Sequence, residues 1–148
     1  MNIKIKTKVK GNYRQIMERF DRALFEALKP KHADMEIVAF TGSKKGDRVH
    51  LRFHRPIPIE WISVITEDGV DDKMAYFIDE GVKLPYPLVH WEHKHIVEKI
   101  TDDSSLIIDD MTFKGSNGVI SALMYPAIYA AFYPRKKIYQ NYFGQASI

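Results

Sequence analysis

The chain contains no cysteine among its 148 residues. Disulfide bonds, thiol nucleophiles and cysteine-ligated zinc sites are therefore excluded. The sequence also has no apolar run near the roughly 18 residues that suggest a membrane helix. Its first residues, MNIKIKTKVK, lack the apolar core of a secretory signal peptide. These absences predict a cytoplasmic protein without stable membrane insertion.

A strong charge of one sign is also missing. The formal net charge is only +3, which is too small to predict a nucleic-acid partner, because such proteins cluster basic residues with stacking aromatic side chains. Hydrophobic residues make up 45% of the chain and charged residues 28%, the balance of an ordinary soluble globular protein. The sequence has no repeat and no linker, so we expect one domain over residues 1–148.

Alternating apolar and charged residues predict strands along most of the chain. In residues 3–10, Ile3, Ile5 and Val9 face one way and four lysines face the other. Six further strands are predicted at residues 35–41, 48–53, 61–68, 73–80, 88–99 and 106–114. Because their connections are short, these strands should form an antiparallel meander.

Two segments change to a helical period. Residues 13–28 follow the first strand, and with Asn12 and Asp21 as candidate caps they predict one helix or two short ones. A long apolar stripe from Val119 to Tyr142 predicts a C-terminal helix. Pro126 and Pro134 lie within this stripe, and since an interior proline removes a hydrogen bond, the helix must kink or restart. A kinked helix against a curved sheet leaves space, which predicts a ligand cavity between them.

The stretch LPYPLVHWEHKHIVE at residues 84–98 carries the main functional signal. Side chains alternate between the two faces of a strand, so Trp91, His93 and His95 share one face while Glu92 and Lys94 share the other. Burying two unpaired charges costs several kcal/mol each, and exposing an indole forfeits roughly 25 cal/mol per Å². The tryptophan and both histidines are therefore predicted to point inward.

The order strand, helical pair, six-strand meander and long helix resembles the helix-grip fold of the START-like (SRPBCC) superfamily. Four local motifs resemble its bacterial ligand-binding or cyclase-like group: Phe77-Ile78-Asp79, Leu84-Pro85-Tyr86-Pro87, Trp91-Glu92-His93-Lys94-His95 and Ile107-Ile108-Asp109. The segment Tyr133-Pro134-Arg135-Lys136 resembles the Arg-bearing end of that group's last helix. The resemblance implies an α+β fold, in which a seven-stranded antiparallel sheet wraps around a long C-terminal helix. Members include lipid-transfer domains, the birch pollen allergen group, polyketide cyclases and aromatases, and activators of a heat-shock chaperone, so the fold implies a cavity rather than one chemistry.

Two histidine–aspartate pairs are predicted on the concave face. Residues opposite each other in a hairpin share a face, which places Asp79 near His93 and Asp109 near His95. Such pairs can form a satisfied structural network, orient the polar end of an apolar ligand, or hold an imidazole as a general base. A metal site is a further alternative, but no third ligand is evident beside the two histidines, so we expect no metal and no cofactor.

The predicted function is binding of a small hydrophobic or amphipathic molecule, lipid- or polyketide-like, between the sheet and the C-terminal helix. The candidate ligand-binding residues are Phe77, Asp79, Trp91, His93, His95, Asp109, Met111, Leu123, Ala127 and Ala131. One alternative is a cyclase, aromatase or hydrolase that uses His93 or His95 as general base, with Asp79 or Asp109 orienting it. Another is an adaptor that binds a protein partner through the same groove. Arg135 is a candidate partner for a ligand carboxylate, but the favoured interpretation is a solvated helix end, because cations are favoured near helix C-termini.

Overall fold

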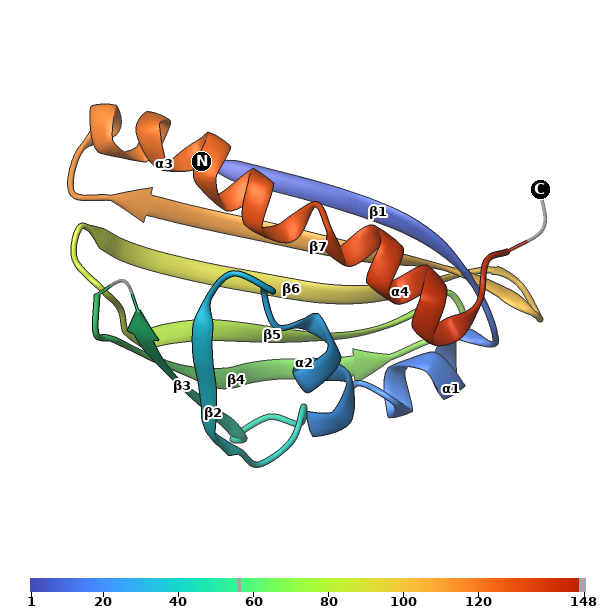
Figure 1. Ribbon diagram of the computed structural model, residues 1–148. Helices are drawn as coiled ribbons and strands as arrows, with labels where there is room; N and C mark the ends of the chain where they lie inside the picture. The colour runs from blue at the N-terminus through green and yellow to red at the C-terminus, as the bar shows by residue number, and fades with distance from the viewer. Residues whose placement is uncertain (56, 147–148) are drawn as a thin grey trace.

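The structure is a computed structural model that describes residues 1–55 and 57–146. Positions 56, 147 and 148 of the domain predicted over residues 1–148 lie outside this description. Seven strands form one antiparallel sheet in the order β1-β7-β6-β5-β4-β3-β2 (Figure 1). Their bounds are β1 Asn2–Lys10, β2 Asp34–Phe40, β3 Arg48–Arg55, β4 Ile59–Val70, β5 Met74–Lys83, β6 Leu88–Thr101 and β7 Ser104–Gly115. The predicted seven-stranded antiparallel sheet, with its last six strands in a meander, is confirmed, although several strands run past their predicted ends.

Four helices cover one face of the sheet within the described residues (Figure 1). They are α1 Tyr13–Glu18, α2 Arg22–Leu28, α3 Gly118–Phe132 and α4 Arg135–Phe143. The side chain of Asn12 accepts a hydrogen bond from the backbone of Arg14, and that of Asp21 accepts one from Leu24, so both predicted caps are confirmed. The residues after the first strand therefore form two helices.

The predicted C-terminal helix is two helices laid end to end along the sheet (Figure 1). Pro126 lies inside α3, and Pro134 separates α3 from α4. Because a proline is tolerated at the beginning of a helix, Pro134 permits a new helix to begin at Arg135. This restart determines which side chains of α4 face the sheet.

Two apolar clusters fill most of the concave face. The first joins α1, α2 and α4 to the sheet and includes Phe20, Leu24, Phe77 and Tyr139. The second joins α3 to the sheet; its buried members are Ile3, Ile5, Leu88, Trp91, Met111 and Phe113, with Met124, Ile128, Phe132, Trp61 and Leu84 packed against them. The histidine–aspartate residues lie where these two clusters meet.

A buried histidine and aspartate cluster

The strand β6 points its aromatic and imidazole side chains inward, as predicted. Trp91, His93 and His95 are buried, with the two histidines only 3% and 2% exposed. Glu92 and Lys94 lie on the opposite face and are half-buried. The orientation on which the candidate site depends is therefore confirmed.

The strand register is also confirmed, but the side-chain hydrogen bonds do not join the residues that lie directly opposite each other. Asp79 lies opposite His93 in the β5–β6 pair, and Asp109 lies opposite His95 in the β6–β7 pair. Nevertheless His93 Nε2 donates to Asp109 Oδ1 at 2.9 Å, and His95 Nε2 donates to Asp79 Oδ2 at 2.8 Å. The predicted neighbours are therefore confirmed, while each hydrogen bond joins a histidine to the aspartate that lies diagonally from it.

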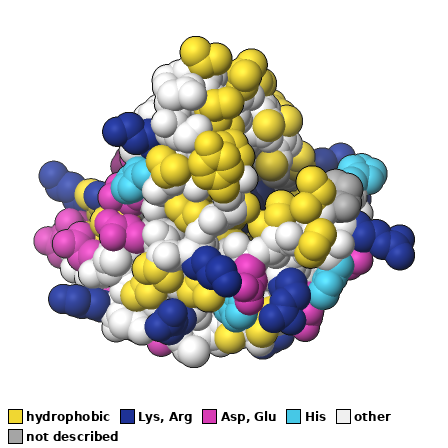
Figure 2. Space-filling view, turned by 90° about the vertical axis from the view of Figure 1, so that its left-hand side faces the viewer, with side chains coloured by type: hydrophobic (Ala, Val, Ile, Leu, Met, Phe, Trp, Pro, Cys, Tyr) yellow, Lys and Arg dark blue, Asp and Glu magenta, His cyan; other side chains and the backbone are white. Residues whose placement is uncertain are grey.

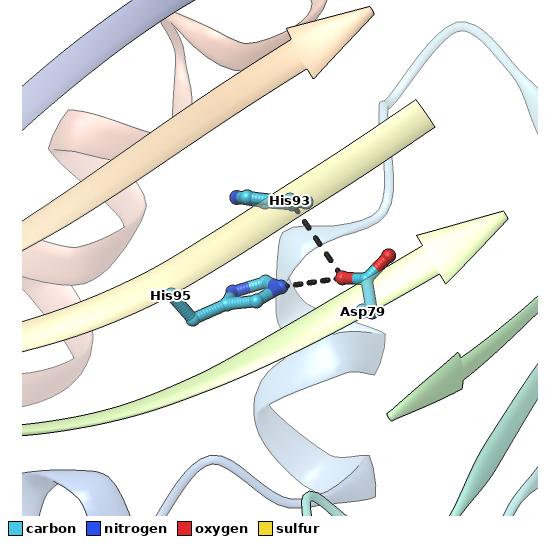
Figure 3. Close-up of side chains that lie close together, drawn as sticks. All are labelled: Asp79, His93 and His95. Carbon is cyan, nitrogen blue, oxygen red and sulfur yellow. Dashed lines mark hydrogen bonds and ion pairs between the residues drawn. The ribbon is translucent and has the colours of Figure 1, made fainter. Parts of the chain in front are cut away.

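The physical reason for the diagonal hydrogen bonds lies in the two imidazole rings. Their centroids are 3.7 Å apart, and each ring reaches the diagonal position on the neighbouring strand, which long side chains can do. His93 Nδ1 remains 3.8 Å from Asp79 Oδ2, beyond hydrogen-bond distance. Figure 3 shows Asp79 directed toward both rings. The cluster is therefore one connected unit rather than two separate pairs.

The helix α4 adds two residues to the cluster. The hydroxyl of Tyr139 donates to Asp109 Oδ1 at 3.3 Å, and Arg135 Nη1 lies 3.7 Å from the same oxygen. The Arg135 side chain is only 15% exposed, and its guanidinium lies over the ring of Phe132 at 4.3 Å. The interpretation of Arg135 as a solvated helix end is therefore wrong.

The restart of the helix at Pro134 explains the position of Arg135. It lies in the first turn of α4, where the helix meets the sheet, rather than near a C-terminus. Tyr139 was not predicted to belong to the site. It follows Arg135 by four residues, and this spacing puts two side chains on one helix face, which is the signal that could have identified it.

Aromatic rings surround the cluster. Phe77 stacks on His95 with centroids 4.2 Å apart, and Phe132 lies edge-on to His93 at 5.4 Å. Trp91 meets Trp61 edge-on at 5.0 Å. Phe77, Trp91 and Met111 are buried on the concave face as expected for lining residues.

Three other predicted lining residues face solvent instead. Leu123 is 66% exposed, and Ala127 and Ala131 are exposed too. The residues of α3 that pack against the sheet are Met124, Ile128 and Phe132. Because α3 is apolar on every side, its sequence contains no polar face that would have fixed its rotation about its own axis.

The surface of the described part of the chain includes two pockets of similar size. One, of about 400 Å³, lies beside the α3–α4 junction, and the other, of about 380 Å³, lies at the ends of β5 and β6. Neither lies between the sheet and α3. The cavity expected there stays a prediction.

The carboxyl groups of the cluster hold their negative charge. Burial acts to raise the pKa of Asp109, but the hydrogen bond from His93 and the nearby charges of His93 and Arg135 bring it down to about 2. Burial also opposes ionisation of Asp79, yet the hydrogen bond from His95 leaves its pKa below the ordinary value. Both carboxylates are therefore ionised at neutral pH.

The other titratable groups respond mainly to burial. Burial, and then the charge of His93, lowers the pKa of His95 to about 4, so its ring is neutral at neutral pH. Burial and the adjacent Asp109 charge raise the pKa of Tyr139. Its hydroxyl therefore stays protonated and donates a hydrogen bond to the carboxylate. The cluster thus combines two carboxylates, one guanidinium, one phenol and two imidazoles, of which that of His95 is neutral.

Three buried polar atoms of the described residues have no hydrogen-bond partner. They are His95 Nδ1, Asp109 Oδ2 and Arg135 Nη1. Leaving such a group unpaired costs about 1–3 kcal/mol, so unpaired buried atoms are unusual in folded proteins. The acceptor Asp109 Oδ2 and the donor Arg135 Nη1 are complementary, and Nη1 lies 3.7 Å from the other oxygen of the same carboxylate, Oδ1, beyond hydrogen-bond distance.

The structure supplies the third metal ligand that the sequence did not reveal. Asp79, His93 and His95 each offer a ligand atom, and these atoms lie within 4.8 Å of one another. However, Nε2 of each histidine donates a hydrogen bond to a carboxylate and offers no lone pair, so these hydrogen bonds would have to change before a metal could be bound through Nε2.

No family model and no curated protein sequence matches the chain. Among solved structures, truncated norcoclaurine synthase from Thalictrum flavum is similar over 99% of this chain and 95% of its own, with 14% identity and a TM-score of 0.69. The protein XoxI from Bacillus cereus is similar over 96% and 94%, with 17% identity and a TM-score of 0.64.

These similarities show the fold. The chain has a helix-grip fold, in which a curved antiparallel sheet carries two short helices after its first strand and its last helices along one face. The fold and the buried cluster together define a helix-grip domain with a polar site on its concave face.

Proposed function

We propose that the protein binds a small hydrophobic molecule that carries a hydroxyl group, between the concave face of the sheet and α3. The observation that supports this proposal most strongly is the unpaired combination of Asp109 Oδ2 and Arg135 Nη1. A hydroxyl placed between them would accept a hydrogen bond from the guanidinium and donate one to the carboxylate. Both buried groups would then be satisfied.

Other polar groups fit these two atoms less well. A ligand carboxylate would be repelled by the ionised Asp109, and a ligand ammonium would be repelled by Arg135 and would offer it no acceptor. A ketone could accept from Arg135 but would leave Asp109 Oδ2 unpaired. The hydroxyl of an alcohol or phenol serves both.

The apolar body of the ligand would lie against the aromatic wall of the second cluster. The α3 residues Met124, Ile128 and Phe132 are only partly buried, so a ligand can take their place against the second cluster if α3 moves outward. One structure of norcoclaurine synthase holds dopamine and hydroxybenzaldehyde. Binding of small molecules by another protein with this fold supports the proposal. The hydroxyl group of the proposed ligand is inferred from Asp109 and Arg135 of this chain.

Calorimetric titration with naphthol and with methoxynaphthalene tests the hydroxyl. The two probes share an aromatic body, but the ether cannot donate to Asp109. A hydrogen bond to a charged group contributes about 1.5–3 kcal/mol, so naphthol should bind roughly 10- to 100-fold more tightly.

Arg135→Met should weaken the binding of both probes, because either probe oxygen can accept a hydrogen bond from Arg135, while the preference for naphthol, which depends on donation to Asp109, should remain. Arg52→Met serves as the matched control, because Arg52 lies on β3 and pairs with Glu60. Equal affinities of the two probes for the unmodified protein would overturn the proposal, as would an Arg135→Met variant that binds both probes as tightly as the unmodified protein does.

Acid–base catalysis is a second candidate, favoured by one observation. His95 donates through Nε2 to Asp79 and leaves the lone pair of Nδ1 without a partner. Its pKa of about 4 leaves that lone pair available at neutral pH but makes it a weak base. Binding is therefore the better supported function.

A further inference from the structure

Residues 118–134 form a charge-free segment that comprises α3 and the two residues after it. Three of its side chains, Met124, Ile128 and Phe132, pack against the sheet and account for one face of the helix. In an ordinary surface helix the opposite face is charged or polar. In α3 it is apolar as well.

The outer face of α3 is exposed to solvent. Val119 and Leu123, one turn apart, are 71% and 66% exposed, and Tyr125, Tyr129 and Tyr133 form a second exposed row. Figure 2 shows hydrophobic side chains gathered on the projecting upper part of the molecule, where α3 lies. A helix that is apolar all round is normally buried, and exposed apolar patches of this kind mark interaction sites.

A basic pocket adjoins the apolar helix. It lies at the α3–α4 junction and is lined by Tyr133, Lys136, Lys137, Gln140, Asn141 and Gln145. Two ammonium groups and three amide groups surround this pocket of about 400 Å³, without a carboxylate among the described lining residues. Lys136 also donates to the backbone carbonyl of Lys6, which leaves its charge unneutralised. The pocket suits an anionic group such as a phosphate.

We propose that α3 and the basic pocket form a docking surface for an anionic phospholipid membrane. Val119 and Leu123 would enter the outer acyl region, while the tyrosine row would lie at the headgroup level, where aromatic side chains with a polar end are favoured. Lys136 and Lys137 would meet the lipid phosphates. The attachment is peripheral, since no helix among the described residues is long and apolar enough to span a membrane.

The position of the charges favours a membrane over a second copy of the chain. In an antiparallel pair of α3 helices, Lys136 and Lys137 of one copy would face the N-terminal end of the other. That end begins at Gly118 after Ser116 and Asn117, and offers backbone N–H groups rather than a carboxylate. A parallel pair would bring the lysines of both copies together. Either dimer leaves the ammonium groups repelled, whereas lipid phosphates neutralise them.

Vesicle co-sedimentation of the full chain tests this surface. We expect binding to phosphatidylcholine vesicles that contain about one third phosphatidylglycerol, weaker binding to phosphatidylcholine alone, and weakening by salt. Val119→Glu should lower the affinity by at least about tenfold, because it removes an inserted apolar group and adds a repelled charge. Val70→Glu should not, since Val70 is 50% exposed at the far end of β4. Circular dichroism of both variants verifies that they fold.

The lysine contribution is tested separately. Lys137→Gln should lower the affinity for the anionic vesicles about fivefold, the effect of one lysine near such a surface, and Lys45→Gln in the β2–β3 turn should not. The proposal is overturned if the protein does not bind anionic vesicles, or if Val119→Glu and Val70→Glu bind equally well. Light scattering that shows a dimer broken by Val119→Glu would assign the surface to a second copy instead. None of these residues touches the hydroxyl site, so each proposal can fail without the other.

Discussion

Acidification should destabilise this protein through one buried histidine. Burial first, and then the charge of His93, lowers the pKa of His95 from 6.5 to about 4. In the unfolded chain the imidazole regains its ordinary pKa, so the unfolded state binds more protons between these two values. The stability associated with neutral His95 is therefore complete above about pH 6.5 and is lost progressively as the pH falls toward about 4.

The size of the effect follows from the two pKa values. Their difference, 6.5 − 4 = 2.5, corresponds to about 3 kcal/mol at 1.36 kcal/mol for each pH unit. By about pH 5, roughly 2 kcal/mol of this should be lost relative to pH 7. Asp79 and Asp109 do not mask the effect, because their lowered pKa values keep both ionised over this range. Since a typical domain is stable by only about 5–15 kcal/mol, the loss is readily measured.

Urea unfolding at the two pH values, followed by tryptophan fluorescence, measures the loss. We expect the unmodified protein to lose about 2 kcal/mol, and His95→Gln to lose much less because it has no imidazole to protonate. His90→Gln is the control, since His90 is an exposed histidine of the same strand. If His95→Gln shows the same loss as the unmodified protein, the assignment of the pH dependence to His95 is wrong.

Two further predictions concern the same cluster. Metal analysis of tag-free protein should find no stoichiometric zinc, iron or nickel, because Nε2 of His93 and of His95 each donates to a carboxylate; one equivalent of any of these metals would show that the cluster rearranges to bind it. On any substrate that the protein is found to convert, His95→Gln should reduce turnover by about 100-fold or more if its free Nδ1 is the general base, and unchanged turnover would exclude that role.

The sequence predicted the parts of the site that depend on strand periodicity. The alternation of residues 91–95 was sufficient to orient Trp91, His93 and His95. Only one of the two orientations buries the indole and leaves the charged Glu92 and Lys94 on the opposite face, where they are only half-buried. The positions of the hairpin turns were sufficient to place Asp79 and Asp109 beside them.

Other features depend on three-dimensional packing that no local pattern encodes. The diagonal arrangement of the hydrogen bonds arises from the side-chain conformations of two stacked imidazoles. The position of Arg135 depends on the restart of the helix after Pro134. The rotation of α3 about its axis, which exposes Leu123, could not be predicted from the sequence. A helix that is apolar on every side has no alternation of polar and apolar residues that would show which face is buried.

The most direct test of the hydroxyl site is a crystal structure of the protein with bound naphthol. The expected structure has the naphthol oxygen within hydrogen-bond distance of both Asp109 Oδ2 and Arg135 Nη1, with its rings against Trp91. Naphthol bound only in the basic pocket beside Lys136, with Asp109 Oδ2 and Arg135 Nη1 still unpaired, would contradict it.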